Sequence, residues 1–186
     1  MPSLGFKKVL ERILEDERYL RNLDWGKPRL GHPEGSLRAH IAELESNLQQ
    51  LASLVSEEEY VKLQILIHVH DTFKPEAKSG APITHARSHA SLARAFLASF
   101  CDDQDLLDIV QYHDEPYALW RHYNDTFQIN ERRLQNLLRT IKNWDLFLFF
   151  LIIDGCTGGK EQTPLIWFFE QIGGKVESRV NKDDIF

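Results

Sequence analysis

His70 and Asp71 stand side by side at the end of the apolar stretch SEEEYVKLQILIHVHD, which covers residues 56–71. Imidazole and carboxylate groups are ligands for divalent metal ions, and they are an unusual way to end the buried part of a helix. Thr72, Phe73 and Lys74 follow directly. The doublet therefore predicts a metal-ligand pair at the end of a buried helix.

Further histidine or aspartate residues stand at similar half-buried positions along the chain, namely His40, His89, His113 and Asp154. A lone histidine on an apolar face is more often a core residue that bonds a carbonyl group. These side chains, however, are all expected on the buried sides of separate helices, as His70 and Asp71 are. Imidazole and carboxylate together suit Fe, Mn, Ni or Zn, and Asp71 would bridge ions about 3.5–4 Å apart if a second one binds.

The helices that must position these residues are indicated by apolar side chains at three- and four-residue steps. Ser36 is expected to cap a helix over residues 37–54, with His40 on its apolar face. Ser56 and Glu59 form a capping box before the helix that ends at His70. Helices are also expected over residues 4–23, 86–100, 105–112, 131–156 and 164–172.

Two stretches do not fit a helical pattern. Residues 25–35 are rich in proline and glycine and predict a loop, and residues 116–130 are aromatic-rich with poor periodicity. No stretch shows the alternation of a strand, so the chain is predicted to be all-α. Its length of 186 residues predicts a single domain, because one core usually suffices up to about 250 residues.

The composition excludes several kinds of partner. Hydrophobic residues make up 42% and charged residues 27%, as in an ordinary soluble protein. A formal net charge of -6 argues against nucleic acid as the main partner, since such proteins usually show a basic excess. The longest strongly apolar run, residues 146–153, is shorter than the roughly 20 residues of a membrane span.

The expected location is the cytoplasm. Cys101 and Cys156 lie far apart and form no CxxC motif, which fits a reducing compartment. The first residues carry acidic side chains within their apolar pattern, unlike a signal peptide. Nothing in the pattern indicates an oligomeric state.

The order of the candidate ligands resembles the HD-domain superfamily, whose signatures are a first histidine, a His-Asp doublet, two more histidines in some branches, and a distant aspartate. The resemblance covers residues 36 to about 156, with the N-terminal and C-terminal helices expected to pack on this part. It implies an HD-domain-like helical bundle with a metal site in its core. By position, one metal would be held by His40, His70, Asp71 and Asp154, and a second would add His89 and His113.

The chain also departs from this pattern. The HPxxGA form of the family is HASLAR from His89, and its HHE form is Tyr112-His113-Asp114, so the departures concern the second metal. A GYP signature is missing, which argues against a cyclic-dinucleotide phosphodiesterase of that branch. The long insert between His113 and Asp154 is expected to shape the substrate pocket.

The resemblance implies a metal-dependent phosphohydrolase that cleaves a small phosphate ester, such as a nucleotide, with a metal-activated water. Asp71 and Lys74 are the predicted catalytic residues, since HDTFK is similar to the HDxGK form of the family, whose lysine faces an anionic substrate. Arg121 and His122 are predicted to bind substrate together with Lys74. The alternatives are a di-iron HD-domain oxygenase that cleaves a C–C or C–P bond, and a non-catalytic ligand-binding regulatory module.

Overall fold

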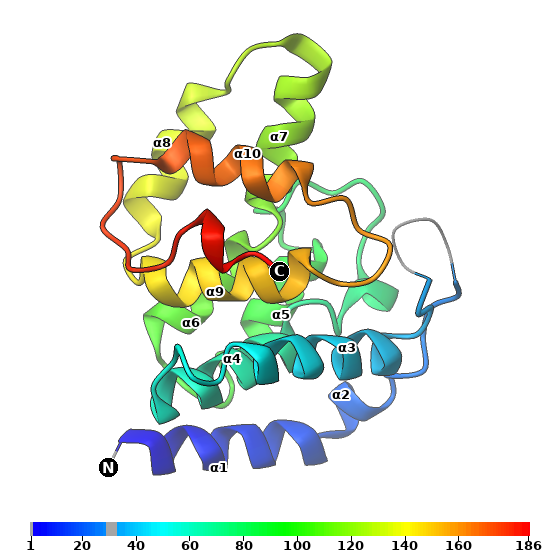
Figure 1. Cartoon of the computed structure of the whole chain (residues 1–186). Helices are drawn as coiled ribbons and strands as arrows, with labels where there is room; N and C mark the ends of the chain where they lie inside the picture. Colours follow the sequence, from blue (N-terminus) through cyan, green and yellow to red (C-terminus); the bar gives the residue numbers. More distant parts are fainter. Residues whose placement is uncertain (1, 29–32) are drawn as a thin grey trace.

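The computed structural model describes residues 2–28 and 33–186, with side chains from residue 5 onward, so residues 29–32 of the predicted loop lie outside the described part. Every regular element in this part is helical and none is a strand, which confirms the all-α prediction for it (Figure 1). The elements are α1 (Pro2–Glu15), α2 (Glu17–Leu20), α3 (Leu37–Gln50), α4 (Glu57–Val69), η1 (Lys74–Glu76), α5 (His89–Leu97), α6 (Gln104–Tyr112), α7 (Glu115–Thr126), α8 (Glu131–Thr140), α9 (Trp144–Gly155), α10 (Thr163–Ile172) and η2 (Lys182–Asp184).

Helix α9 forms the centre of the core. All its side chains over residues 146–153 are buried, because an apolar run without a polar face must be covered on every side. It packs against α3 and α4 on one side and α10 on the other, and α1 covers α4 from outside. These helices lie roughly one above another in Figure 1. The arrangement brings the last turn of α9 near α3 and the end of α4.

Side-chain caps fix where the site-bearing helices begin. Ser36 accepts a hydrogen bond from the Ala39 amide at 3.2 Å, and Ser56 forms the predicted reciprocal capping box with Glu59. Ser88, which the sequence did not single out, caps α5 immediately before His89. Such a cap satisfies an amide group of the first turn and stabilises a helix by about 1 kcal/mol.

The predicted helix over residues 4–23 is interrupted. Helix α1 ends at Glu15, and Asp16 then caps the short helix α2 by accepting from the Arg18 amide at 2.8 Å. Ile13 and Tyr19, on either side of the break, are both buried. The interruption lets both segments face the core.

The stretch from Glu115 to Cys156 also differs from the sequence expectation. The long helix predicted over residues 131–156 is broken between α8 and α9, where Asn143 caps α9 by accepting from the Leu146 amide at 3.0 Å. The irregular segment expected over residues 116–130 is mostly the regular helix α7. Its periodicity is poor because it packs against both α8 and α10.

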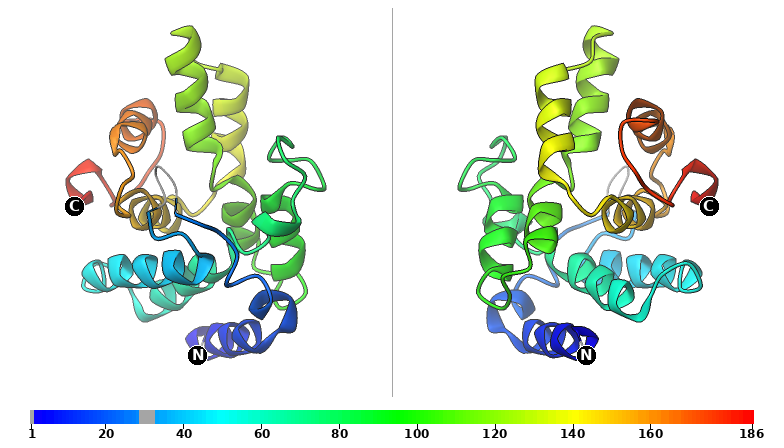
Figure 2. Two further views of the ribbon diagram at one scale, coloured as in Figure 1. Left: turned by 90° about the vertical axis from the view of Figure 1, so that its right-hand side faces the viewer. Right: turned by 90° about the vertical axis from the view of Figure 1, so that its left-hand side faces the viewer.

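Helices α7 and α8 project from the other helices (Figure 2). Arg133 of α8 ties the two helices together, since it donates to both carboxylate oxygens of the buried Glu115 of α7 at 2.7 and 2.6 Å. At their tip, Phe127 has a left-handed backbone with φ 55° and is 82% exposed.

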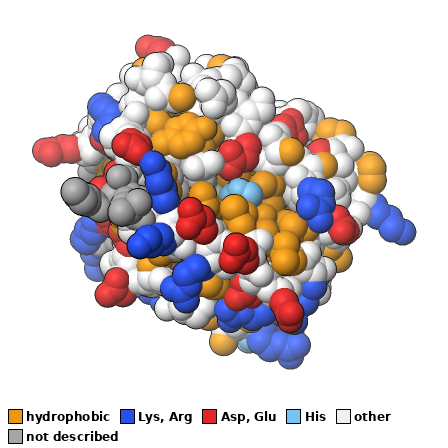
Figure 3. Space-filling view, turned by 90° about the horizontal axis from the view of Figure 1, so that it is seen from below, with side chains coloured by type: hydrophobic (Ala, Val, Ile, Leu, Met, Phe, Trp, Pro, Cys, Tyr) orange, Lys and Arg blue, Asp and Glu red, His pale blue; other side chains and the backbone are white. Residues whose placement is uncertain are grey.

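Charged side chains of both signs are interspersed on the face of the molecule shown in Figure 3. That face therefore shows no basic stripe of the kind that follows a nucleic-acid backbone. Among the described helices, none combines the length and apolar character that crossing a membrane requires.

Candidate metal centre

His40 lies on the core-facing side of α3. The residue is 3% exposed, and the adjacent Ile41 belongs to the hydrophobic core. His40 Nε2 lies 3.3 Å from Asp154 Oδ1, and its Nδ1 lies 3.0 Å from Glu34 Oε1. Asn47, on the same helix, donates to the Ile153 carbonyl at 2.9 Å. This buried bond holds α3 and α9 in register, so that His40 faces Asp154.

His70 caps the end of α4, and its ring is fixed from both sides. Nδ1 lies 3.1 Å from the carbonyl oxygens of Leu66 and Ile67, which only accept, so Nδ1 carries the hydrogen. The ring packs edge-on against Phe150 of α9, with centroids 5.1 Å apart. The lone pair of the neutral ring is therefore on Nε2, which points toward Asp71 and Asp154.

His113 and His89 form the other half of the cluster. His113 caps the end of α6, and its Nδ1 lies 2.8 Å from the Val110 carbonyl oxygen, so this ring also presents Nε2. His89 is the first residue of α5, directly after the Ser88 cap. The two Nε2 atoms are 3.3 Å apart. Helices α5 and α6 pack against each other, which brings these histidines together although they are 24 positions apart in sequence.

Asp71 lies between the two halves. Its Oδ2 is 3.5 Å from His70 Nε2, and its Oδ1 is 3.5 Å from His113 Nε2 and 3.6 Å from His89 Nε2. Lys74 forms an ion pair with the same Oδ2 atom. The six predicted ligands thus form adjacent donor groups in which potential ligand atoms lie within 4.8 Å of one another, namely His40 with His70 and Asp154, and Asp71 with His89 and His113.

This donor set fits divalent transition metals. His70 Nε2 and Asp71 Oδ1 are buried and have no hydrogen-bond partner in the described part of the chain. A buried polar atom left in this way costs about 1–3 kcal/mol, whereas an ion between such atoms would satisfy them. Imidazole and carboxylate are ligands for Fe, Mn, Ni and Zn. These two donor groups together contain all six metal ligands that were predicted from the sequence.

The carboxylates of the cluster are held in their charged form. Burial opposes ionisation of Asp71, but the ammonium group of Lys74 outweighs it and holds the Asp71 pKa well below its ordinary value. Burial likewise opposes ionisation of Asp154, and Lys160 together with His40 keeps its pKa well below the ordinary range. Both side chains are therefore anionic at neutral pH, as metal ligands must be.

The histidines of the cluster differ in charge. Burial lowers the pKa of His70, so its ring is neutral at neutral pH. Burial also disfavours the charged form of His113, but the carboxylates of Asp114 and Asp71 outweigh it and raise the His113 pKa to about 9. A metal ion at His113 would replace the proton on Nε2, because a ligating imidazole must be neutral there.

Several residues of the site were not predicted from the sequence. Asp114 Oδ2 lies 3.1 Å from His89 Nε2, and Lys160 donates to Asp154 Oδ1 at 2.7 Å. Glu34 and Glu43 form a third potential donor group with His40. Asp114 follows His113 directly, which is a signal that the sequence offers. Lys160 shows no such signal, since its contact depends on how the chain turns after α9.

The predicted substrate-binding residues divide into two sets. Lys74 belongs to the cluster, whereas Arg121 and His122 lie on α7, exposed and half-buried respectively. In the described part of the chain, neither of those two side chains forms an ion pair with a member of the cluster. Their role stays a prediction. Tyr123, the next residue of α7, stacks on Trp167 of α10, with ring centroids 5.2 Å apart.

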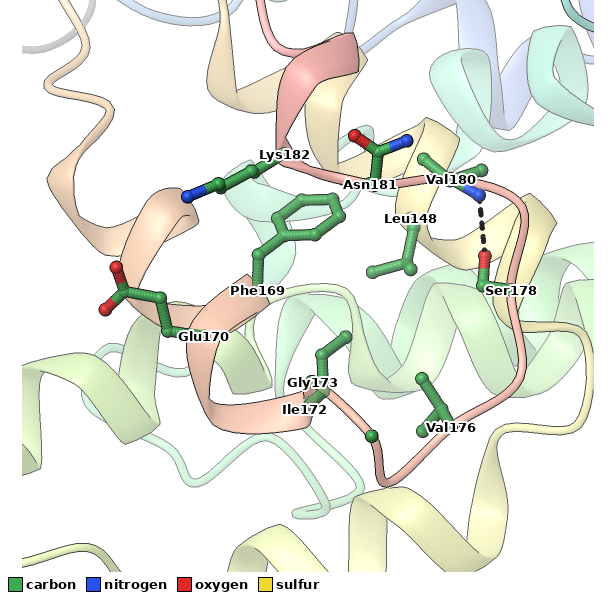
Figure 4. A pocket seen from close by; sticks show the side chains of 11 residues that line it. Leu148, Phe169, Glu170, Ile172, Gly173, Val176, Ser178, Val180, Asn181 and Lys182 are labelled. Carbon is green, nitrogen blue, oxygen red and sulfur yellow. Dashed lines mark hydrogen bonds between the residues drawn. The ribbon is translucent and has the colours of Figure 1, made fainter.

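A surface pocket of about 350 Å³ lies elsewhere, between α9, α10 and the C-terminal segment (Figure 4). Leu148, Phe169, Ile172 and Val176 give it an apolar floor, and Glu170 and Lys182 lie near its edge. None of the candidate metal ligands lines this pocket.

Comparison with known proteins yields no relative: no family model matches the chain, and neither the search of curated proteins nor that of solved structures finds a match. The assignment of chemistry therefore rests on the residues of the cluster.

Proposed function

We propose that this chain is a metal-dependent phosphohydrolase of the HD-domain type, which acts on a small phosphate ester such as a nucleotide. The observation that carries the proposal is the position of Asp71, with one oxygen toward His70 and the other toward His89 and His113. A carboxylate between donor groups suits a two-ion site. Bound ions supply Lewis-acid chemistry there, because they activate water and offset the charge of a phosphoryl group.

The residues of the chain orient this chemistry. The Nδ1 atoms of His70 and His113 donate to helix carbonyl groups, which keeps both Nε2 atoms aimed at the site without side-chain rearrangement. Lys74 pairs with Asp71 and remains 23% exposed, so its ammonium group can also face an anionic substrate. Its role is to bind phosphoryl oxygens, for which a lysine acts as a point charge.

A second candidate is an iron-dependent oxygenase. His89 and His113, together with Asp71 and Asp114, offer a pair of imidazoles and more than one carboxylate. Sites with two histidines and one carboxylate hold non-haem iron in many oxygenases. The two proposals differ in whether the reaction requires dioxygen, because an oxygenase consumes it and a phosphohydrolase does not.

The test is to load the purified chain with Mn²⁺, Zn²⁺ or Fe²⁺ and measure phosphate release from a panel of nucleotides and simple phosphate monoesters, in air and under argon. Phosphohydrolase chemistry predicts equal rates in both atmospheres and loss of activity with a chelator. Turnover that requires dioxygen and an iron pair would refute hydrolysis and support the oxygenase.

Matched histidine variants complete the test. His70→Ala should lose metal and activity, whereas His85→Ala should keep both, because the His85 ring is exposed, accepts from the Arg87 amide at 3.0 Å and belongs to none of the potential donor groups among the described residues. Absence of metal from the wild type, with ligand binding unchanged in His70→Ala, would instead support a non-catalytic regulatory module.

A further inference from the structure

The turn after α9 folds back onto the cluster of candidate metal ligands and places the Lys160 side chain next to Asp154. Lys160 Nζ donates to Asp154 Oδ1 at 2.7 Å and to the Asp154 carbonyl oxygen at 3.0 Å. The turn is closed by the Lys160 amide, which donates to the Thr157 carbonyl at 3.2 Å. Gly159 makes this path possible, since its φ is +81° and a Cβ there would lie 2.9 Å from Pro33 Cδ.

Lys160 and Lys74 approach the cluster in the same way. Lys74 pairs with Asp71 Oδ2 and Lys160 with Asp154 Oδ1. These oxygens lie 3.5 and 4.0 Å from the same atom, His70 Nε2. Each ammonium group is therefore separated from one imidazole nitrogen by a single carboxylate oxygen, so an anion bound beside His70 would be within reach of both lysines.

The ammonium group of Lys160 and a metal ion compete for one oxygen. Asp154 Oδ1 also lies 3.3 Å from His40 Nε2, so it is the oxygen that completes the first donor group. Two cations held on one oxygen repel each other by several kcal/mol unless solvent screens them. Lys160 has room to move aside, because its side chain is 21% exposed and the preceding Gly158 and Gly159 are exposed. Its four-carbon stem allows this at little cost.

We propose that Lys160 is a substrate-binding residue that pairs with Asp154 until a metal ion takes its place, and then binds the phosphoryl group of the substrate. The inference rests on the proposed function and extends it, because it assigns a second cation to the anionic part of the substrate. Lys160 stabilises the cluster by neutralising Asp154 before metal binds. After metal binding, its charge adds to that of Lys74 on the substrate side.

The experiment uses Mn²⁺ and inorganic phosphate as probes, with both affinities measured by calorimetry on the full chain. Lys160→Gln should bind Mn²⁺ up to about fivefold more tightly, because a partly exposed ion pair no longer competes for Asp154. The Mn²⁺-loaded variant should bind phosphate about tenfold more weakly, since a charge-assisted hydrogen bond is lost. Lys160→Arg should recover most of the phosphate affinity, and Lys182→Gln, an exposed lysine on η2, should match the wild type in both measurements.

The outcomes distinguish the two proposals. Phosphate affinity that is unchanged in Lys160→Gln, or Mn²⁺ affinity that falls in it, would show that Lys160 is only structural and would overturn the inference while the metal site stands. A wild-type chain that binds no Mn²⁺ would overturn both. Lys160→Arg keeps the positive charge. If Lys160→Gln fails to fold, the phosphate affinity of Lys160→Arg can still be compared with that of the wild type. Weak phosphate binding by Lys160→Arg together with a tightened Mn²⁺ affinity would also overturn the assigned role.

Discussion

Replacing Asp71 with asparagine should remove the stabilisation that a divalent metal ion gives the folded chain. The amide group of asparagine keeps the size of the carboxylate but loses its charge. Because Asp71 has one oxygen 3.5 Å from His70 Nε2 and the other 3.5 Å from His113 Nε2, the substitution affects both donor groups at once. Among the described residues, no other carboxylate of the cluster lies between the two groups in this way.

The size of the effect follows from linkage. An ion at a concentration one hundred times its Kd, bound only by the folded state, adds about 2.7 kcal/mol to the free energy of unfolding. In a chain of this length, 1 kcal/mol shifts the melting temperature by about 2–4 °C. The wild type should therefore gain about 5–11 °C on metal addition. Without metal, Asp71→Asn should itself be about 3 kcal/mol less stable, because it leaves the ammonium group of Lys74 without its carboxylate.

The assay is thermal unfolding followed by circular dichroism, with and without saturating metal. Asp145→Asn is the matched control: Asp145 lies at the other end of α9 and accepts from Ser178 and Arg179, so its loss should lower stability but leave the metal-induced gain intact. A gain of several degrees in Asp71→Asn would refute the reasoning.

Three further predictions concern the scaffold. Asn47→Ala should cost about 1–3 kcal/mol in urea unfolding, because it leaves the Ile153 carbonyl unpaired in the core, and a cost near zero would contradict this. Burial raises the pKa of Tyr19 to about 12, so the free energy of unfolding should fall as pH rises from about 10, where an unfolded tyrosine ionises; Tyr19→Phe should lack this fall, which denaturation at alkaline pH would measure. Ser56→Ala should cost about 1 kcal/mol through the lost capping box, and an unchanged urea midpoint would argue against it.

The sequence allowed the residues that form the cluster to be predicted, because each stands where an apolar helical face begins or ends; their role as metal ligands stays a prediction. His40 follows the periodicity of α3, and His70 ends an apolar run after a clear capping box. The burial of both side chains and their positions on the helices could therefore be predicted from the sequence. The structure brings these residues together with Asp154, His89 and His113. Whether the bundle belongs to the HD-domain superfamily stays a prediction, as does its chemistry.

Other features depend on tertiary packing that the sequence does not encode locally. The break before α9 rests on the Asn143 cap within an otherwise helical pattern, and α7 lacks clear periodicity because it packs on more than one side. Lys160 could not be assigned to Asp154 without the turn at Gly159. In each case, the local sequence is compatible with more than one conformation, and the packing of the surrounding helices selects the one that is observed.

The most direct test of the proposed two-ion site is a crystal structure of the metal-loaded chain, with anomalous diffraction measured at the absorption edge of the metal. The geometry of the cluster predicts one anomalous peak among His40, His70 and Asp154 and another beside His89 and His113, with Asp71 between them. The separation should be about 3.5–4 Å, as in other two-metal sites. Absence of anomalous signal at Asp71, with metal bound elsewhere on the chain, would contradict the account.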